Sequence, residues 1–510
     1  MTYLRNYRAI HAINYMLLMG VIMFAQTILP CAEISSFAAV SNDGKGNARN
    51  VHTETWLTVN DYPEGDGPEN TACGGIPFKQ GILFYERDLK LLNGEAEIPI
   101  AVKILAYWPD NSVRVILIQF NAELSGESKK YMLRIGTPRG ESDTPLVPVT
   151  WDFPRKIITL QADYLCESLV VWEQIPLGKT TFPEWEQKQL KYYHKISDVG
   201  TEPCAGRDQY YNSIHSTYQI YARTGEMKYL VNGRKWALHH RRDQIYLDGN
   251  RIGHAKCGDP SKTRYTYIQG LVDDYFFWGD EKSKRVSGLI ADNFYMKHED
   301  RWYYRAPGGR GFWTEREAAF ALLGLVTHFE ATNDAVYLKA AKHRIDLLHK
   351  MQIDNGRTAW IHNLHDHDPA EGCDVDDWGS SPWMSGLLLE GIIKFHKLTG
   401  DDNAAVSIFM ALDYLMENCL ASTGKHTGKS FVYLGCPKRT NGVPDLDNLI
   451  SHAYAYGYKL SDGTREDYLD LARDLLNTSV GYGGVHSSKQ FNQQFRASGH
   501  TVFHLMKAIR

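Results

Sequence analysis

The sequence lacks the patterns that assign a nucleotide, a cofactor or an activated serine. No glycine-rich phosphate loop or dinucleotide fingerprint follows a predicted strand, and no G-x-S-x-G turn is present. We therefore expect no cofactor, with the role of a divalent cation left open. A net charge of -4 gives no basic excess, so nucleic acid is not an expected partner.

Cysteines are also few for the length of the chain. The 510 residues include 8 cysteines, which lie far apart and form no C-x-x-C pair. This spacing excludes a zinc cluster and a disulfide scaffold, and it leaves room for one or two disulfide bonds.

The first 38 residues have the pattern of an export signal. Arg5 and Arg8 precede an apolar stretch from Ile13 to Leu29, and residues 36–38 are suited to a cleavage site. We expect a secreted or periplasmic protein that begins near Ala39 and has no membrane contact after signal removal. An uncleaved membrane anchor is the alternative.

An internal repeat of helix pairs dominates the rest of the chain. In residues 264–280, apolar side chains recur at i, i+3, i+4, i+7 and i+8 from Ile268, the pattern of a half-buried helix. Similar units end at Glu226, Asp334, Asp401 and Gly463. Second helices are predicted at about 228–241, 282–296, 337–351, 404–418 and 465–477, and a last helix at about 490–507.

The connections between these helices alternate in length. Those within a pair have two to four residues, whereas those between pairs are long: 243–262, 297–312, 352–380, 419–446 and 478–489. Repeats of about 50 to 65 residues are too irregular for a solenoid, so a closed α/α toroid is predicted. All long loops then lie at one face with the starts of the first helices, and this face is the candidate active site.

Before the helices, the pattern changes to period two. Residues 103–120 alternate on both sides of Asp110-Asn111, a hairpin turn pair, and residues 129–136 add a strand. We expect a β-barrel or sandwich domain at 50–149. Residues 150–205, with the apolar runs IITL and LVVW, are predicted to be a connector with extra strands. The toroid is expected at 206–510, as the catalytic domain.

The phrases GIPF (75–78) and LKLLNGEAEIPIAVKILAYWPDNSVRVILIQF (89–120), with this strand order, resemble the N-terminal RIFT-barrel domain of exo-acting rhamnogalacturonan lyases and their relatives. In that family a β domain of this type precedes an α/α toroid. The resemblance implies a multidomain α+β chain with a RIFT-like barrel, a toroid of about five to six hairpins, and polysaccharide lyase activity. The central β-sandwich of larger members has no room in residues 150–205, so their substrate does not carry over.

Cleavage of a uronate-containing chain by β-elimination needs three groups. A cation or amide neutralises the carboxylate, a base removes the C5 proton, and an acid protonates the leaving oxygen. Tyrosine, with a free pKa of ~10, becomes a base only beside positive charge. Residues of these types at the long-loop face give the candidate catalytic set Tyr265, His254, His215, Tyr211 and His452. The candidate substrate-binding set is Arg207, His240, Lys256, Arg264, Arg310, Trp313, Arg316, Trp378 and Asn448.

Spacing motivates several of these choices. Arg207, Tyr211 and His215 are four residues apart and line one side of a helix start, as Asn448 and His452 do on a later helix. The resemblance places histidines at the loop that contains His254. Structural roles compete: an ion-paired helix start, a core histidine, or a cation near a helix C-terminus for His239 or His240.

The loop HNLHDHDPAEGCDVDDWGSSPW (362–383) allows three interpretations. It forms a metal site from His362, His365, His367 and the aspartates, or a carboxylate pair for glycoside hydrolysis, or a solvated loop with Trp378 as a sugar platform. The carboxylates available for hydrolysis are Asp374, Asp376, Asp377 and Glu315. Glu315 and Glu317 also suit the helix dipole of a first turn.

These observations favour an exported polysaccharide lyase that acts on an acidic, uronate-containing glycan. A glycoside hydrolase of uronic oligosaccharides and a non-catalytic glycan-binding protein are the alternatives.

Overall fold

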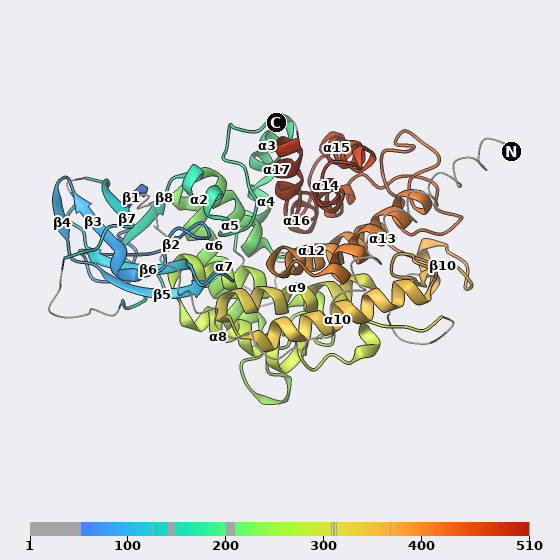
Figure 1. Ribbon diagram of the computed structural model, residues 1–510, viewed down its shortest axis with the longest axis horizontal. Coiled ribbons are helices and arrows are strands. Elements are labelled where there is room, and N and C mark those ends of the chain that lie inside the picture. Colours follow the sequence, from blue (N-terminus) through green and yellow to red (C-terminus); the bar gives the residue numbers. More distant parts are fainter. Residues whose placement is uncertain are drawn as a thin grey trace, which may run out of the picture. The chain divides into compact units, whose positions relative to one another are not determined.

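The computed structural model describes residues 53–124, 126–140, 148–199, 210–307, 309, 312, 314–367 and 369–508. The predicted export signal, residues 1–38, lies outside this part of the chain. A β domain comes first and a ring of helical hairpins follows (Figure 1), which confirms the predicted order of the two architectures.

The β domain is an eight-stranded sheet with the order β4-β3-β7-β1-β8-β2-β6-β5. Its strands are β1 (Thr53–Asp61), β2 (Thr71–Pro77), β3 (Leu89–Asn93), β4 (Ala96–Ile98), β5 (Ala101–Tyr107), β6 (Val113–Asn121), β7 (Ser128–Ile135) and β8 (Lys156–Leu160). Neighbours are antiparallel except β2 and β8, which are parallel. The edge strands β4 and β5 are only two residues apart in the chain, so the sheet curls until its edges approach each other.

The hairpin of β5 and β6, at one edge of this sheet, is the one that the sequence predicts. β5 and β6 flank a turn in which Asn111 has φ 65°, the left-handed conformation that asparagine tolerates. Asp110 Oδ1 accepts hydrogen bonds from the backbone N–H and the hydroxyl of Ser112, at 3.0 and 2.6 Å. These contacts fix the register in which Ile104 lies opposite Ile116.

Residues 150–199 supply more than a link between the domains. The IITL run lies in β8, which pairs with both β1 and β2. The LVVW run, expected as a strand, is not one. Leu169 and Trp172 have φ 56° and 62°, which breaks an extended conformation, and only an isolated bridge joins Val170 to Trp172. Three helices, α2 (Ala162–Ser168), α3 (Pro183–Tyr192) and α4 (His194–Ser197), complete this segment.

The helical ring consists of hairpins joined by long loops. Its inner helices are α5 (Ser213–Thr224), α7 (Ile268–Trp278), α9 (Glu315–Thr332), α12 (Pro382–Thr399) and α14 (Ser451–Leu460). The second helices are α6 (Met227–His239), α8 (Glu281–Ile290), α10 (Ala335–Asp354), α13 (Asp402–Asn418) and α15 (Glu466–Gly481). Inner helices α7, α9 and α12 are buried over nearly their whole length, because helices or the β domain cover them on all sides.

The last helical segment closes the ring against the first hairpin. The single helix predicted at 490–507 is instead two, α16 (Ser488–Phe495) and α17 (Ser498–Ala508). At the break, Gln219 of α5 donates a hydrogen bond to the Arg496 carbonyl at 2.9 Å. Asn492 donates to the Tyr210 carbonyl and to the Ser213 hydroxyl, both at 2.9 Å. These bonds join the two ends of the helical sequence.

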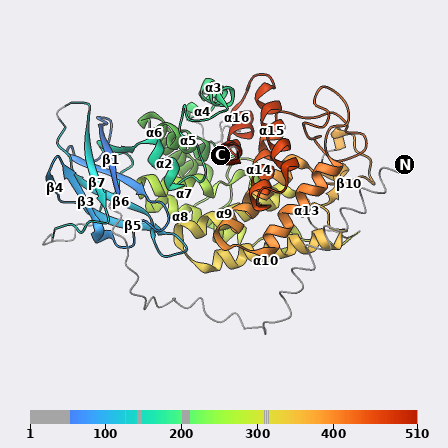
Figure 2. The same cartoon turned by 45° about the horizontal axis from the view of Figure 1, so that its top comes forward.

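The β domain packs against the end of the ring that carries the short turns. Tyr275 donates to the Leu105 carbonyl at 3.1 Å, and Asn333 donates to the Tyr107 carbonyl at 3.1 Å. Figures 1 and 2 show the β domain at one end of the ring and β10 (Trp378–Gly379), in a long loop, at the other. The long-loop face is therefore built by the toroid without the barrel.

None of the helices in the described ranges is both long enough and apolar enough to cross a bilayer.

Replacing Gly75 with alanine tests the joint between β2 and α7. A Cβ at Gly75 would lie 1.8 Å from the Phe276 carbonyl oxygen, so the backbones would have to separate. We expect a loss of ~3 kcal/mol or more of unfolding free energy, measured as a lower midpoint of thermal or urea unfolding.

The matched control is Gly481→Ala at the end of α15, where an added Cβ meets nothing within 4 Å. This variant should unfold at the wild-type midpoint or slightly above it, since alanine favours a helix. Equal unfolding midpoints for Gly75→Ala and Gly481→Ala would contradict the close packing of β2 against α7.

Candidate active site

The first turn of α9 organises the long-loop face. Its first three residues, Glu315, Arg316 and Glu317, each contact a different neighbouring loop. The sequence places them there because Thr314, in extended conformation, ends the preceding loop and the apolar helix pattern begins directly after it. Three consecutive polar side chains thus join four segments of the ring.

Arg316 is the side chain that reaches the first hairpin. Its Nη1 donates to the Tyr210 hydroxyl at 3.3 Å, and its guanidinium lies 5.4 Å from the ring centre of Trp383, at the start of α12. Tyr211 packs edge-on against Tyr210 with ring centres 4.5 Å apart, and it is fully buried. The guanidinium is therefore held among aromatic rings from two other hairpins.

Glu317 fixes the second hairpin. Its Oε2 accepts from the Thr263 N–H at 2.9 Å and from the Thr263 hydroxyl at 3.1 Å, while its Oε1 lies 3.6 Å from Arg264. The next residue, Tyr265, packs against Tyr210 with ring centres 5.7 Å apart. Tyr210, Tyr211, Arg264, Tyr265, Arg316 and Trp383 therefore form one group, which we name the α9 cluster.

Glu315 attaches the third long loop, residues 352–380. Its Oε1 accepts from the Ser380 hydroxyl at 2.6 Å and from the Ser381 N–H at 2.9 Å, and its Oε2 lies 3.4 Å from His362 Nδ1. Burial raises the pKa of Glu315 to about 7 and lowers the pKa of His362 to about 3. Glu315 is thus a carboxyl group that exchanges its proton near neutral pH, behind a neutral histidine.

The phenols of the α9 cluster differ in their surroundings. Burial raises the pKa of Tyr210, with Tyr211 adding to the rise and Arg316 and Arg264 opposing it. Burial likewise raises the pKa of Tyr211. Both are therefore proton donors at neutral pH. Tyr265 is only half-buried, and the Arg264 guanidinium lies 5.2 Å from its ring centre.

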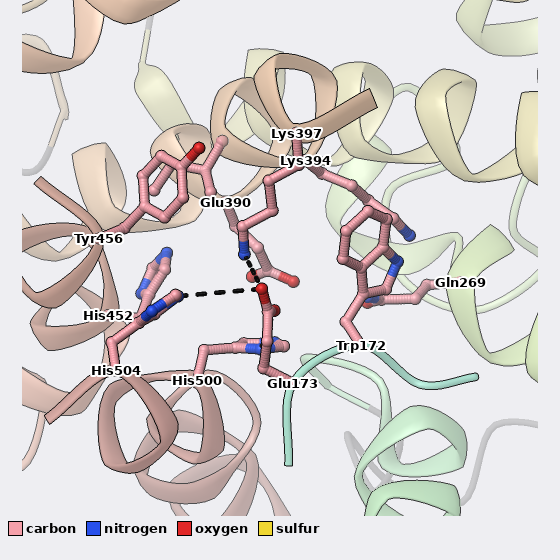
Figure 3. A pocket seen from close by; sticks show the side chains of 11 residues that line it. Trp172, Glu173, Gln269, Glu390, Lys394, Lys397, His452, Tyr456, His500 and His504 are labelled. Atoms are coloured by element: carbon pink, nitrogen blue, oxygen red, sulfur yellow. Dashed lines mark ion pairs between the residues drawn. The ribbon is translucent and has the colours of Figure 1, made fainter. Parts of the chain in front are cut away.

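The axis of the ring contains a polar cavity (Figure 3). Its lining includes two lysines, two glutamates and three histidines, contributed by α12, α14, α17 and the segment after α2. The space open to the centres of water molecules is about 30 Å³. Since one water needs ~10–15 Å³ by this measure, two or three waters fit and a sugar ring does not.

Glu173 enters this cavity from the segment that links the β domain to the ring. Its Oε1 lies 2.6 Å from Lys397 Nζ and 3.9 Å from His504 Nε2, and its Oε2 lies 3.2 Å from His500 Nδ1. Figure 3 shows these groups converging on its carboxylate. Burial alone would raise the pKa of Glu173, but Lys397 and the two histidines hold it well below its usual value.

Two of the predicted histidines lie at this axis. His452 lines the cavity, and neither of its ring nitrogens has a hydrogen-bond partner among the described residues. His215 Nδ1 lies 2.5 Å from Asp273 Oδ2. Burial lowers the pKa of His215 and raises that of Asp273, so burial favours a pair without net charge.

The predicted residues thus divide into groups. Tyr211, Tyr265, Arg264 and Arg316 meet in the α9 cluster, whereas His215 and His452 lie deeper in the ring. His254 is elsewhere, with its ring 4.1 Å from that of Phe294 and its Nδ1 on the Pro260 carbonyl at 2.8 Å.

Three further candidates have partners that hold them within the scaffold. His240 contacts Gln244 at 2.9 Å, Lys256 donates to the Arg242 carbonyl at 3.3 Å, and Asn448 donates to the Gln494 carbonyl at 3.0 Å. Trp378 lies in β10, and the last three candidates, Arg207, Arg310 and Trp313, lie outside the described residues.

The candidate carboxylates of the third long loop have separate surroundings. Asp374 pairs with Lys438, and Asp377 Oδ2 accepts from the Asp374 N–H at 2.7 Å, while Asp376 is exposed. Cys373 forms a disulfide with Cys436, and Cys257 is also disulfide-bonded, in agreement with the one or two bonds expected.

The residues that the metal interpretation of this loop requires have separate contacts and do not form one metal centre. His362 faces Glu315, and His365 Nδ1 donates to the Cys373 carbonyl at 2.8 Å. Cys373, Asp377 and Cys436 offer ligand atoms within 4.8 Å of one another, but both sulfurs are in the disulfide and are not thiolates.

Sequence reasoning missed several residues of the site. Tyr210 adjoins a predicted candidate and could have been found from it. Glu390, Lys394 and Lys397 lie at i, i+4 and i+7 of an otherwise apolar helix, which is the signal of a polar stripe facing the axis. Glu173 carries no such signal, because its place depends on how the linking segment enters the ring.

Replacing Glu173 with glutamine should destabilise the fold. The change leaves Lys397 buried without its carboxylate, so we expect a loss of ~3 kcal/mol at pH 7, read from urea unfolding. Glu281→Gln is the control: its ion pair with Lys103 is half exposed, and its loss should cost under ~1 kcal/mol.

The pH dependence of the unfolding free energy is a second test with the same variant. The folded-state pKa of Glu173 lies below the reference value of 4.5, so its ionisation stabilises the fold above that pH and the benefit is lost as pH falls. The stability difference between wild type and Glu173→Gln should therefore shrink below pH 4.5. A difference that stays constant with pH would contradict the assignment.

Residues 52–123 match the family model of the PcRGLX-like N-terminal RIFT barrel domain, which confirms the resemblance seen in the sequence and spans β1 to β6. No curated protein matches the chain.

Several solved structures are similar to the chain. A polysaccharide lyase is 11% identical, with 64% of this chain and 97% of that chain covered and a TM-score of 0.48. A glycosyl hydrolase family 88 protein from Bacteroides vulgatus is 11% identical, with 62% and 99% covered and a TM-score of 0.46. A cellobiose 2-epimerase from Spirochaeta thermophila is 14% identical, with 65% and 100% covered and a TM-score of 0.44. These similarities do not discriminate between lyase, hydrolase and epimerase activity.

Proposed function

We propose that the protein is a polysaccharide lyase that cleaves an acidic, uronate-containing glycan by β-elimination. The observation that carries the proposal is the α9 cluster, in which two guanidiniums and three phenols meet at the long-loop end of the ring. These are the groups that such an elimination requires: cations for the carboxylate, and a base and an acid for the two proton transfers.

The roles follow from the surroundings of each group. Arg316 and Arg264 bind the uronate carboxylate and stabilise the negative charge that develops when C5 loses its proton. Tyr265, whose ring lies 5.2 Å from the Arg264 guanidinium, is the base that receives that proton. The electron pair forms the C4–C5 double bond while the C4–O bond breaks. Tyr210, which burial keeps protonated, donates its proton to the leaving oxygen.

A glycoside hydrolase is the second candidate, favoured by one observation. The pKa of Glu315, raised to about 7, is that of a general acid. Hydrolysis also needs a second carboxylate ~5–10 Å away across the substrate. Glu317 is bonded to Thr263 and Asp374 is paired with Lys438, so these two carboxylates already have structural partners.

The predicted export agrees with a polysaccharide lyase, because its polymer substrate would lie outside the cell. The Cys373–Cys436 disulfide is compatible with an oxidising compartment, where such bonds persist. It agrees with the predicted export signal without depending on it.

The test of the reaction is to incubate the full-length mature protein with pectic, alginate, ulvan and glycosaminoglycan chains. Ultraviolet absorbance from the C4–C5 double bond of the product is the expected result. New reducing ends without this absorbance would reject the lyase in favour of the hydrolase. Binding without cleavage of any chain would indicate a glycan-binding protein.

Replacing Tyr265 with phenylalanine should lower kcat by about 10²–10⁴-fold with little change in KM, because only the proton transfer is lost. Tyr482→Phe, at an exposed ring, is the matched control and should leave both constants unchanged. Wild-type kcat in Tyr265→Phe would exclude this residue as the base.

Replacing Arg316 with lysine should lower kcat/KM by about 10²-fold or more, since lysine keeps the charge and loses the fork of donors. Arg301→Lys, at an exposed side chain, is its control. Thermal unfolding of both variants separates a loss of activity from a loss of fold.

A further inference from the structure

We propose that Trp378 and Arg305 form a second glycan-binding subsite, at the rim of the long-loop face, for a sugar residue of the same acidic chain. This inference rests on the proposed function for its ligand, an acidic glycan, and goes beyond it by placing a second contact outside the α9 cluster. Trp378 is 45% exposed, a large fraction for an indole held in an ordered strand.

Arg305 lies directly against this indole. Its guanidinium carbon is 4.2 Å from the ring centre of Trp378, and its Nη2 donates to the Ile361 carbonyl at 2.8 Å. The side chain is 4% exposed, its Nε has no hydrogen-bond partner, and no carboxylate pairs with it within the described residues. A buried guanidinium that lacks a carboxylate is unusual, because charges in protein interiors are normally paired.

The arrangement provides two complementary contacts. An exposed indole face binds the apolar face of a pyranose ring, as aromatic side chains do with other flat apolar surfaces. The unpaired charge of Arg305, close to the indole, attracts a carboxylate on that sugar or on its neighbour in the chain through space. A uronate residue gains from both the stacking and the charge, whereas a neutral sugar gains only from the stacking.

The strand that carries Trp378 is unusually well fastened for a loop. Trp378 pairs with Asn363 in the two-stranded sheet of β9 (His362–Asn363) and β10. The Cys373–Cys436 disulfide joins this loop to the next long loop, and Glu371 pairs with Arg439 across the same junction. A platform held in this way loses little conformational freedom on binding, which favours affinity.

The platform is also continuous with the α9 cluster. Two residues after Trp378, the Ser380 hydroxyl donates to Glu315 Oε1 at 2.6 Å, in the same helical turn as Arg316. Trp383, which contacts Arg316, follows three residues later. A glycan chain bound at the α9 cluster therefore has a second contact point on the same loop.

The experiment measures glycan binding separately from cleavage. Wild type, Trp378→Ala and Trp56→Ala are run in native gels that contain polygalacturonate, alginate, ulvan or chondroitin sulfate, with neutral cellulose and mannan derivatives as comparison. Trp56 is the matched control because it is 41% exposed on β1, in the other domain. At least one acidic glycan should retard wild type and Trp56→Ala, with about tenfold weaker binding for Trp378→Ala.

A second pair of variants tests the two contacts apart. Trp378→Phe should restore part of the affinity. Arg305→Gln should reduce the preference for acidic over neutral glycans, with thermal unfolding as a check on its fold. Opening the disulfide with Cys373→Ser and Cys436→Ser together should weaken binding although Trp378 is still present.

The outcomes separate this subsite from the proposed reaction. No retardation of wild type by any acidic glycan, or equal retardation of Trp378→Ala and Trp56→Ala, overturns the subsite. Binding that depends on Trp378 without any unsaturated product leaves the subsite and rejects the lyase. If Trp378→Ala forms unsaturated product with an unchanged KM, the lyase is supported and the subsite is rejected.

Discussion

The first turn of α9 is the constraint on which the long-loop face depends. Glu315, Arg316 and Glu317 have almost no freedom, because each is buried or half-buried and bonded to a different loop. Leaving any of these groups unpaired in the interior would cost several kcal/mol. The loops are therefore fixed relative to one helix rather than to one another, and side chains that are 50 to 170 residues apart in sequence meet at defined distances. This geometry holds side chains from separate loops in one fixed arrangement.

The axis of the ring follows a different principle. Glu173, Glu390, Lys394 and Lys397 are charges in the interior, and they are tolerated because each has a partner of opposite sign: Lys397 with Glu173, Lys394 with Glu330, and Arg496 with Glu390. Arg114 of the β domain also binds Glu330, so the barrel and the ring share one network. Apolar side chains would fill this space more simply. The polar network instead specifies which domain and which segment close the ring, since a misplaced segment would leave charges without partners.

Much of the architecture could be predicted from the sequence, because it depends on local patterns. A few consecutive residues are enough to recognise the helix period, the short turns of the Thr-Gly-Asp type and the Asp110-Asn111 pair. Part of the site could also be predicted from the sequence. Helix starts after long loops share one face of the ring, and these positions include Tyr211, Tyr265, Arg264 and Arg316. His254 meets the same criterion, but the loop turns back and places its ring on Phe294. Asp273 and Glu173 could not be predicted, because their burial is decided by ring closure and by an unrelated segment rather than by their own neighbours in sequence.

The β domain covers the short-turn end of the ring, and the segment after α2 inserts Trp172 and Glu173 into the axis from that side. The ring is therefore closed at its short-turn end, and the long-loop face is the end that the β domain leaves uncovered.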